Sequence, residues 1–348
     1  MTINNILTIK DTYWNRALQV MVAATVAICV GYAFNLDYSY WVTLSAIITI
    51  RATTGASIKR AKERIFGTIM GILTGAMLLY LIPNTNYFII TVPLFTFLAV
   101  YLFNNYYYYS IFFTSILLIL LLSHGAPSIW HFAFARILDT FIGVTIGLIA
   151  SYLLWPNASR IELKKNLQKT LSCSQNYFAL LSKNILEKNT TTTSDEKYEI
   201  ENSLIESMRS FKEFSYEPGV MPIKTEAVYS LIVSLNIVHN LLLAIALVAN
   251  KLADLSISNN QRITYFVQQI TSGFNENIMH LDQMNPPLKD SVFNIDHWKT
   301  DIMLIEEQEL KQMMSNQTPK NMALIFYVYQ LKKLAIELKH INQAILEL

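Results

Sequence analysis

The sequence predicts an all-α protein, with a six-span helical membrane bundle followed by a cytosolic helical domain. The chain is 53% hydrophobic and only 15% charged, whereas soluble globular proteins average about 25% charged residues. Charged residues are sparse before Pro156 and frequent after it. We therefore expect a transmembrane module over residues 1–156 and a water-soluble α-helical domain over residues 157–348.

Six apolar stretches precede Trp155. A helix of about 20 apolar residues crosses the hydrocarbon core of a bilayer, which is roughly 30 Å thick. The stretches predict spans near residues 16–34, 39–57, 64–82, 86–103, 107–123 and 130–155.

Basic residues orient these spans, because loops rich in Lys and Arg stay on the cytoplasmic side. The loops near residues 35–38, 83–86 and 123–128 contain no Lys or Arg. The opposite side holds Lys10, Arg16, Lys59, Arg60, Lys62 and Arg64. We expect both ends of the module inside the cell, in a multi-pass protein of the inner membrane whose C-terminal domain lies in the cytoplasm.

Small residues recur every four positions on two predicted spans. On the third span they are Gly67, Gly71 and Gly75. On the sixth they are Ala135, Gly143, Gly147 and Ser151, and Asp139 lies on the same face at the same spacing. Small residues on one face let helix backbones approach closely in lipid. We therefore assign these glycines to helix packing.

The sixth predicted span also carries two opposite charges. Arg136 and Asp139 are three residues apart, so their side chains can meet on one helical face. Ionisable residues inside a membrane are costly and are candidates for function. One interpretation is a structural ion pair. The other is a site in which Arg136 binds an anionic substrate and Asp139 carries a proton.

The second predicted span ends ambiguously. Arg51 lies only about 15 Å of helix beyond Tyr40, roughly half a bilayer. Either Arg51 extends to the cytosolic interface, or the helix breaks at residues 52–55 and Arg51 lines a cavity. Hydroxyl side chains recur every four residues at Ser45, Thr49, Thr53 and Ser57. They serve either helix packing or substrate binding, and they share a pathway with Arg51 only if the helix is interrupted.

The second half of the chain has a helical pattern. Leu167, Leu171, Phe178, Leu181 and Ile185 follow one face, and a further helix is expected near residues 196–214. The last helix begins at Thr318-Pro319 and carries a heptad seam from Leu324 to Leu348, which packs either in its own bundle or against a second chain. Residues 227–249 are apolar enough for a seventh span. Polar side chains at their centre favour a buried core helix instead.

Three segments in combination resemble one known family. They are YWVTL from Tyr40, GASIKRAKERIFGTIMGILTG from Gly55, and ARILDTFIGVTIG from Ala135. Together they resemble the fusaric acid resistance protein-like and aromatic acid exporter superfamily. The resemblance implies efflux of aromatic or other organic acids across the inner membrane. Longer members hold two membrane modules in one chain, which implies a homodimer here. The plant malate channels of the aluminium-activated type look like distant relatives.

The leading hypothesis is a secondary transporter that exports small organic anions, aromatic carboxylic acids in particular. Its substrate-binding candidates are Arg51, Arg136, Ser45 and Thr49, and Asp139 is the proton-coupling candidate. An organic-anion channel and a non-transporting membrane scaffold are the alternatives.

The expected partners are membrane lipid, the anion and a second copy of the chain, with a periplasmic adaptor protein as a further candidate. Neither half is basic enough to indicate nucleic acid. No nucleotide-binding loop or hydrolase motif occurs in the sequence. We expect no enzymatic activity, cofactor or metal.

Overall fold

The computed structural model describes residues 3–81, 88–104, 106–122, 129–154, 159–187, 194–217, 222–253, 261–283 and 319–347. Every regular element within these ranges is an α-helix, as the sequence predicts. The chain divides into two compact units. Unit 1 comprises Met1–Ser159 with Tyr216–Pro218, and unit 2 comprises Arg160–Ser215 with Gly219–Leu348.

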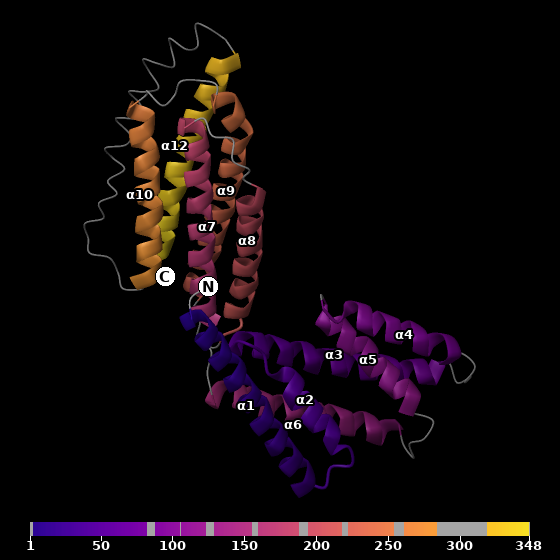
Figure 1. Ribbon diagram of the computed structural model, residues 1–348. Helices are drawn as coiled ribbons and strands as arrows, with labels where there is room; N and C mark the ends of the chain where they lie inside the picture. Colours follow the sequence, from indigo (N-terminus) through magenta and orange to yellow (C-terminus); the bar gives the residue numbers. More distant parts are fainter. Residues whose placement is uncertain are drawn as a thin grey trace. The chain divides into compact units, whose positions relative to one another are not determined.

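Unit 1 contains one helix at each of the six expected positions. They are α1 (Ile3–Ala33), α2 (Ser39–Thr49), α3 (Thr54–Leu81), α4 (Phe88–Leu102), α5 (Tyr107–Leu122) and α6 (Ile129–Leu153). Helix α2 packs between α1 and α6, whereas α3 packs against α5 and α6 (Figure 1). Helix α3 therefore connects α5 with α2 and α6.

Four of the described helices are long and apolar enough to cross a membrane. They contain Trp14–Ala33, Thr54–Leu81, Trp130–Leu153 and Lys224–Ala249. The apolar segments Ser39–Thr49, Ile90–Leu102 and Tyr107–Leu121 are shorter. By length and composition, three described helices of unit 1 and one of unit 2 can thus cross a membrane.

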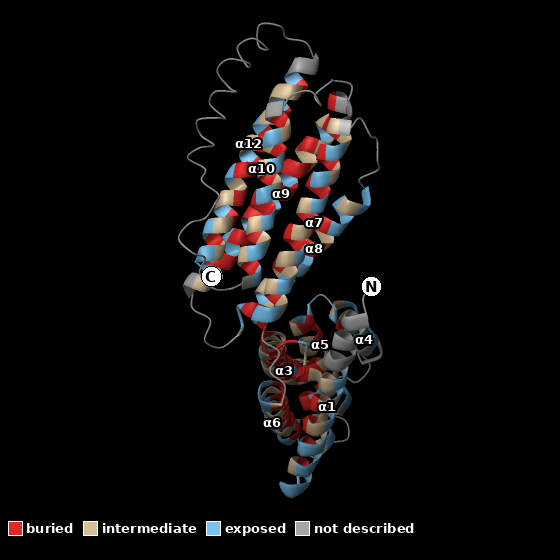
Figure 2. Cartoon of the chain, turned by 60° about the vertical axis from the view of Figure 1, so that its left-hand side comes forward, coloured by how far each residue is buried: buried red, intermediate tan, exposed pale blue. Residues whose placement is uncertain are grey.

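The exposed faces of unit 1 are apolar, as helix α3 illustrates. Phe66, Met70, Leu73 and Met77 lie on its exposed face, while the opposite face buries Arg64 with several glycines and threonines. A water-soluble helix has the reverse pattern, with apolar residues inside. Figure 2 shows the buried residues of unit 1 on the sides where helices meet. The pattern fits a helix whose solvent is lipid.

The second predicted span is interrupted, as one of the two alternatives for Arg51 requires. Helix α2 ends at Thr49, and Ile50 adopts an extended backbone with φ −69° and ψ 124°. Hydrogen bonds hold the break, because the Arg51 N–H donates to Ser57 Oγ at 2.9 Å and the Ala56 N–H donates to Thr53 Oγ1 at 3.1 Å. The break covers residues 50–53, two positions earlier than expected.

The third span begins much earlier than the sequence suggested. Helix α3 starts at Thr54, so the basic cluster of residues 59–64 is helical and not a loop. Its last member, Arg64, is only 2% exposed. The predicted span began at Arg64, whereas this residue lies ten positions inside α3. A count of charges cannot distinguish an interfacial arginine from one that neighbouring helices cover.

The two glycine stripes lie at helix contacts. A Cβ built on Gly67 would lie 2.9 Å from the Tyr108 carbonyl oxygen, and one on Gly75 would lie 3.1 Å from Ile119 Cβ, so this stripe faces α5. A Cβ on Gly147 would lie 2.7 Å from the Ala46 carbonyl oxygen of α2. The glycines let α3 approach α5 and let α6 approach α2.

Unit 2 is a bundle of α7 (Ser159–Glu187), α8 (Ser194–Phe214), α9 (Pro222–Ala253), α10 (Gln261–Gln283) and α12 (Pro319–Leu346). Each of the five contributes to one apolar core, for example through the fully buried Leu171, Ile200, Leu242, Phe274 and Leu338. The predicted apolar face of α7 is confirmed, since its five residues are all in this core.

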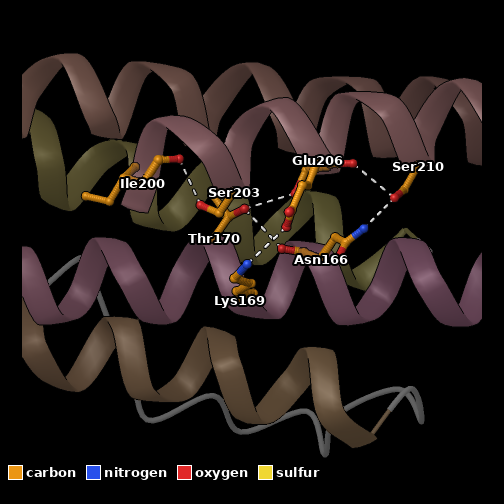
Figure 3. A network of polar contacts seen from close by, with 8 residues as sticks. Asn166, Lys169, Thr170, Ile200, Ser203, Glu206 and Ser210 are labelled. Atoms are coloured by element: carbon orange, nitrogen blue, oxygen red, sulfur yellow. Dashed lines mark hydrogen bonds and ion pairs between the residues drawn. The ribbon is translucent and has the colours of Figure 1, made fainter. Parts of the chain in front are cut away.

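Polar contacts also join α7 to α8 (Figure 3). Thr170 Oγ1 and Ser207 Oγ are 2.9 Å apart and fully buried, and Lys169 Nζ lies 3.0 Å from Glu206 Oε2. Small hydroxyl side chains let the two helices pack closely while satisfying their own hydrogen bonds. Hydrogen bonds and an ion pair thus supplement apolar contact at this interface.

The structure shows the surroundings of α12 and α9, the two helices whose packing the sequence left open. The seam of α12 faces its own bundle, because Tyr327, Leu331 and Ile341 are at most 1% exposed within the unit 2 core. Helix α9 satisfies the length and hydropathy of a span, yet it exposes Glu226 and Asn240 on its outer face. Such polar side chains are costly in contact with lipid.

Candidate functional site

Two arginines are buried in the interior of unit 1. Arg64 comes from α3 and is 2% exposed, while Arg136 comes from α6 and is 5% exposed. Asp139, one helical turn beyond Arg136, is 2% exposed. These are the buried charged side chains of unit 1 within its described residues, so positive charge exceeds negative charge there. Removing a guanidinium from water costs several kcal/mol unless partners compensate it.

Arg64 has protein partners on three of its nitrogens. Its Nε and Nη2 donate to Ser45 Oγ at 3.3 and 3.1 Å, and its Nη1 donates to the Tyr107 hydroxyl at 3.1 Å. The Thr49 hydroxyl donates to the Ser45 carbonyl oxygen at 2.7 Å. Helices α2, α3 and α5 therefore meet at one satisfied guanidinium.

Sequence reasoning did not select Arg64 or Tyr107 as site residues. A signal for Arg64 was present, because it lies at helical spacing on the same face as Gly67, Gly71 and Gly75. A charge on the packing face of a helix must enter the bundle. Nothing in the run of four tyrosines from Tyr106 distinguishes Tyr107, because only the fold places its hydroxyl against an arginine.

Arg136 stacks on an indole ring. Its Cζ lies 3.7 Å from the centre of the Trp41 ring, a cation–π contact between α6 and α2. The sequence analysis gave Trp41 no role in binding. Trp41 and Ser45 are four residues apart on α2, so that one face of α2 meets both buried arginines.

Three buried N–H donors at this contact have no hydrogen-bond partner among the described residues. They are Nε and Nη1 of Arg136 and Nε1 of Trp41. Leaving a buried donor unsatisfied costs about 1–3 kcal/mol, and more for a charged group. Native structures rarely leave such groups together without a functional reason. The three donors define a candidate anion site, which we call the Trp41–Arg136 site.

The expected contact ion pair between Arg136 and Asp139 is not formed. No ion pair within 4.0 Å joins them among the described residues, and Asp139 Oδ2 has no hydrogen-bond partner there. The spacing of three residues permits the pair, but the guanidinium of Arg136 lies over the Trp41 ring instead. Two opposite charges are thus buried near one another without neutralising each other through direct contact.

Arg51 lies in the break between α2 and α3 and is half-buried. Its Nε is a further buried donor without a partner in the described structure. Among the predicted hydroxyl residues, Ser57 is saturated, since its Oγ accepts from the Arg51 N–H and from Ser151 Oγ and donates to the Thr53 carbonyl oxygen. The hydroxyl stripe is therefore divided between holding Arg64 and holding the break.

Comparison with known proteins agrees with this architecture. The family model described as fusaric acid resistance protein-like matches residues 26–150, a range that includes all the site residues above. The uncharacterized membrane protein YvaC of Bacillus subtilis (strain 168) is 27% identical over 159 residues, which are 45% of this chain and 25% of YvaC.

Two relatives from Escherichia coli (strain K12) extend the comparison. The inner membrane protein YccS is 24% identical over 160 residues, 45% of this chain and 22% of YccS. The uncharacterized transporter YdhK is 34% identical over 65 residues, 19% of this chain and 10% of YdhK. The matched segment of this chain thus spans a quarter or less of the length of these three relatives.

The matching relatives named as membrane proteins and the long apolar helices together make this chain a multi-pass membrane protein. The three segments that suggested the family, the match to its model and the helix packing around those segments coincide over residues 26–150. Residues 26–150 thus match the fusaric acid resistance protein-like family, the family that the sequence resembles.

Proposed function

We propose that this protein is a secondary transporter that exports small organic anions, aromatic carboxylic acids in particular, and that it binds the carboxylate at the Trp41–Arg136 site. The supporting observation is the group of three buried, unpartnered N–H donors on Trp41 and Arg136. A carboxylate is an acceptor-only anion that forms short, strong hydrogen bonds with charged donors. An aromatic substrate would also suit the neighbouring indole ring.

The other predicted binding residues receive narrower roles in this proposal. Ser45 and Thr49 hold Arg64 in place, because Ser45 accepts from Arg64 and Thr49 bonds the Ser45 carbonyl oxygen. Arg51 contacts the anion elsewhere on its route. Asp139 carries a proton, since it is a buried carboxyl with a free oxygen one turn from Arg136. An anion arriving at Arg136 changes the charge that Asp139 experiences and hence its protonation.

The membrane arrangement belongs to the same proposal. We place the six helices of unit 1 across the inner membrane with the N-terminus inside, and unit 2 in the cytoplasm. The short α2 and the irregular residues 50–53 suit this, because irregular backbone at membrane depth is tolerated where protein covers it. Two copies assemble as a homodimer. A periplasmic adaptor protein is a further proposed partner.

The alternatives make different demands on the site. A scaffold needs tightly packed helices but has no use for buried donors without acceptors, so the Trp41–Arg136 site disfavours it. An anion channel uses the same donors but requires no proton carrier. The buried Asp139 favours coupled transport over a channel.

The test is transport of radiolabelled benzoate by the full chain in proteoliposomes, with and without a pH gradient. We expect a gradient to accelerate wild-type flux and Arg136→Gln to abolish it. The matched control is Arg209→Gln, because the Arg209 side chain is 82% exposed on α8. Equal flux in Arg136→Gln and wild type contradicts the proposed site. Benzoate flux that ignores the gradient indicates a channel, and no flux of any carboxylate tested indicates a scaffold.

A further inference from the structure

Tyr107 occupies an unusual position between two arginines. It is the first residue of α5 and only 4% exposed. Its hydroxyl accepts a hydrogen bond from Arg64 Nη1 at 3.1 Å, while the Cζ of Arg60 lies 3.6 Å from the centre of its ring. The ring also makes an edge contact with Phe103. One side chain therefore restrains two cations of α3 by two different interactions.

Unpartnered N–H donors of arginine lie at two separate places in unit 1. One place is the Trp41–Arg136 site. The other is the half-buried Arg51, whose Nε has no partner among the described residues. Arg60 is the charged group that acts most strongly on Arg51. We call Arg51 and Arg60 the first station, and the Trp41–Arg136 site the second station.

Tyr107 is connected to both stations through the arginines of α3. Its ring lies against Arg60 of the first station. Arg64, which donates to the Tyr107 hydroxyl, also donates to Ser45, four residues from Trp41 on α2. Tyr107 thus contacts the first station directly and reaches the helix face of the second station through Arg64 and Ser45.

We propose that Tyr107 is a gate between these two anion stations, so that a small monocarboxylate binds first at Arg51 and Arg60 and then passes Tyr107 to reach Trp41 and Arg136. This inference rests on the proposed function and adds the route and the residue that controls it. A carboxylate binds a guanidinium more strongly than an aromatic face does. An anion at the first station therefore withdraws Arg60 from the Tyr107 ring.

The second step follows from the hydroxyl contact. Once Arg60 has left the ring, the side chain of Tyr107 is held by Phe103 and by its hydrogen bond to Arg64. Breaking that hydrogen bond frees the ring to turn and frees Arg64 Nη1 to attract the anion. The closed gate keeps the anion from crossing without displacement of Tyr107, which prevents uncoupled leakage.

Tyr107→Phe tests the gate, because it keeps the ring for Arg60 and Phe103 and removes only the hydroxyl. Tyr109→Phe is the matched control, since Tyr109 lies two residues away on α5 and is 52% exposed. The assays are equilibrium binding of radiolabelled benzoate to the purified full chain, and benzoate flux in proteoliposomes without a pH gradient.

We expect Tyr107→Phe to retain benzoate binding and to raise flux without a gradient by about ten-fold, the factor expected for one hydrogen bond to a charged group. Tyr109→Phe should match wild type in both assays. A second variant, Arg60→Gln, should raise the half-saturating benzoate concentration for flux, because it removes one of the two cations of the first station. It should also raise flux without a gradient, because it removes the cation that restrains the Tyr107 ring.

The outcomes separate the gate from the proposed function. If wild type carries benzoate and Arg136→Gln does not, but Tyr107→Phe has wild-type flux without a gradient, the gate is wrong and the second station stands. Reduced binding together with reduced flux in Tyr107→Phe shows a merely structural role and also overturns the gate. If wild type neither binds nor carries benzoate, the proposed function and the gate fail together.

Discussion

Gly143→Ala tests how closely the helices around the arginines are packed. A Cβ built at Gly143 would meet the Val42 carbonyl oxygen and would lie 2.5 Å from Ser45 Cβ. Carbon atoms in contact sit about 3.5–4.0 Å apart, so α2 and α6 must separate by about 1 Å. Because the obstacle is backbone, no side-chain rotation relieves it. Overpacking of this kind costs about 1–3 kcal/mol.

The same separation disturbs the site. Ser45 holds Arg64 through hydrogen bonds of 3.1 and 3.3 Å, and a shift of about 1 Å takes them beyond hydrogen-bonding distance. We therefore expect Gly143→Ala to lower both the thermal stability and the benzoate flux. At about 2–4 °C for each kcal/mol, the melting temperature in detergent should fall by roughly 2–12 °C.

Gly75→Ala is the matched control for this substitution. Its Cβ would lie 3.1 and 3.2 Å from side-chain atoms of Ile119, which a shift of a few tenths of an ångström relieves. Alanine also favours the helix by about 1 kcal/mol over glycine, so stability should stay equal or rise. The two proteins are compared by thermal aggregation in detergent and by flux at equal protein amounts. Equal stability and flux in the two variants refute the packing argument.

Four further predictions follow from the structure. Burial raises the pKa of Cys173 to about 11. In a variant with Cys29 replaced by Ser, maleimide should therefore label Cys173 at pH 8 on the order of 100-fold more slowly than a free thiol of pKa about 8.5. Labelling at the free-thiol rate contradicts the described α7 packing. Asp139→Asn should remove the effect of a pH gradient on flux while the protein still folds, and full gradient-driven flux in the double variant with Arg136→Gln would end both roles. The mass of the detergent-purified protein should be twice 39.9 kDa, and a monomer that transports would contradict the dimer. A reporter fused after Leu348 should lie in the cytosol and one after Asn35 outside the cell; an outside signal at Leu348 would make α9 a membrane span.

The helices were predictable because their signals are local. Apolar length placed all six helices of unit 1, and the apolar spacing on α7 and α12 identified the faces that form the core of unit 2. The proline at residue 319 also marked the start of α12 correctly.

The site was only partly predictable, because it depends on contacts between distant segments. Arg136 and Asp139 are neighbours in sequence, so they suggested an ion pair, but the stacking of Arg136 on Trp41 requires the approach of α6 to α2. The break after Thr49 depends on the Arg51 N–H reaching Ser57, and neither residue alone indicates a helix end. Hydropathy likewise treats a buried arginine and an interfacial arginine alike.

The most direct test of the central claim is equilibrium binding of radiolabelled benzoate to purified Trp41→Phe protein. Phenylalanine keeps an aromatic face for Arg136 but removes the unpartnered indole N–H. Trp130→Phe is the control, because Trp130 is 72% exposed. If Trp41 and Arg136 hold the carboxylate, binding should weaken about 10- to 100-fold in Trp41→Phe, the loss of one hydrogen bond to a charged group, and should be unchanged in Trp130→Phe. Wild-type affinity in Trp41→Phe would show that the anion binds elsewhere.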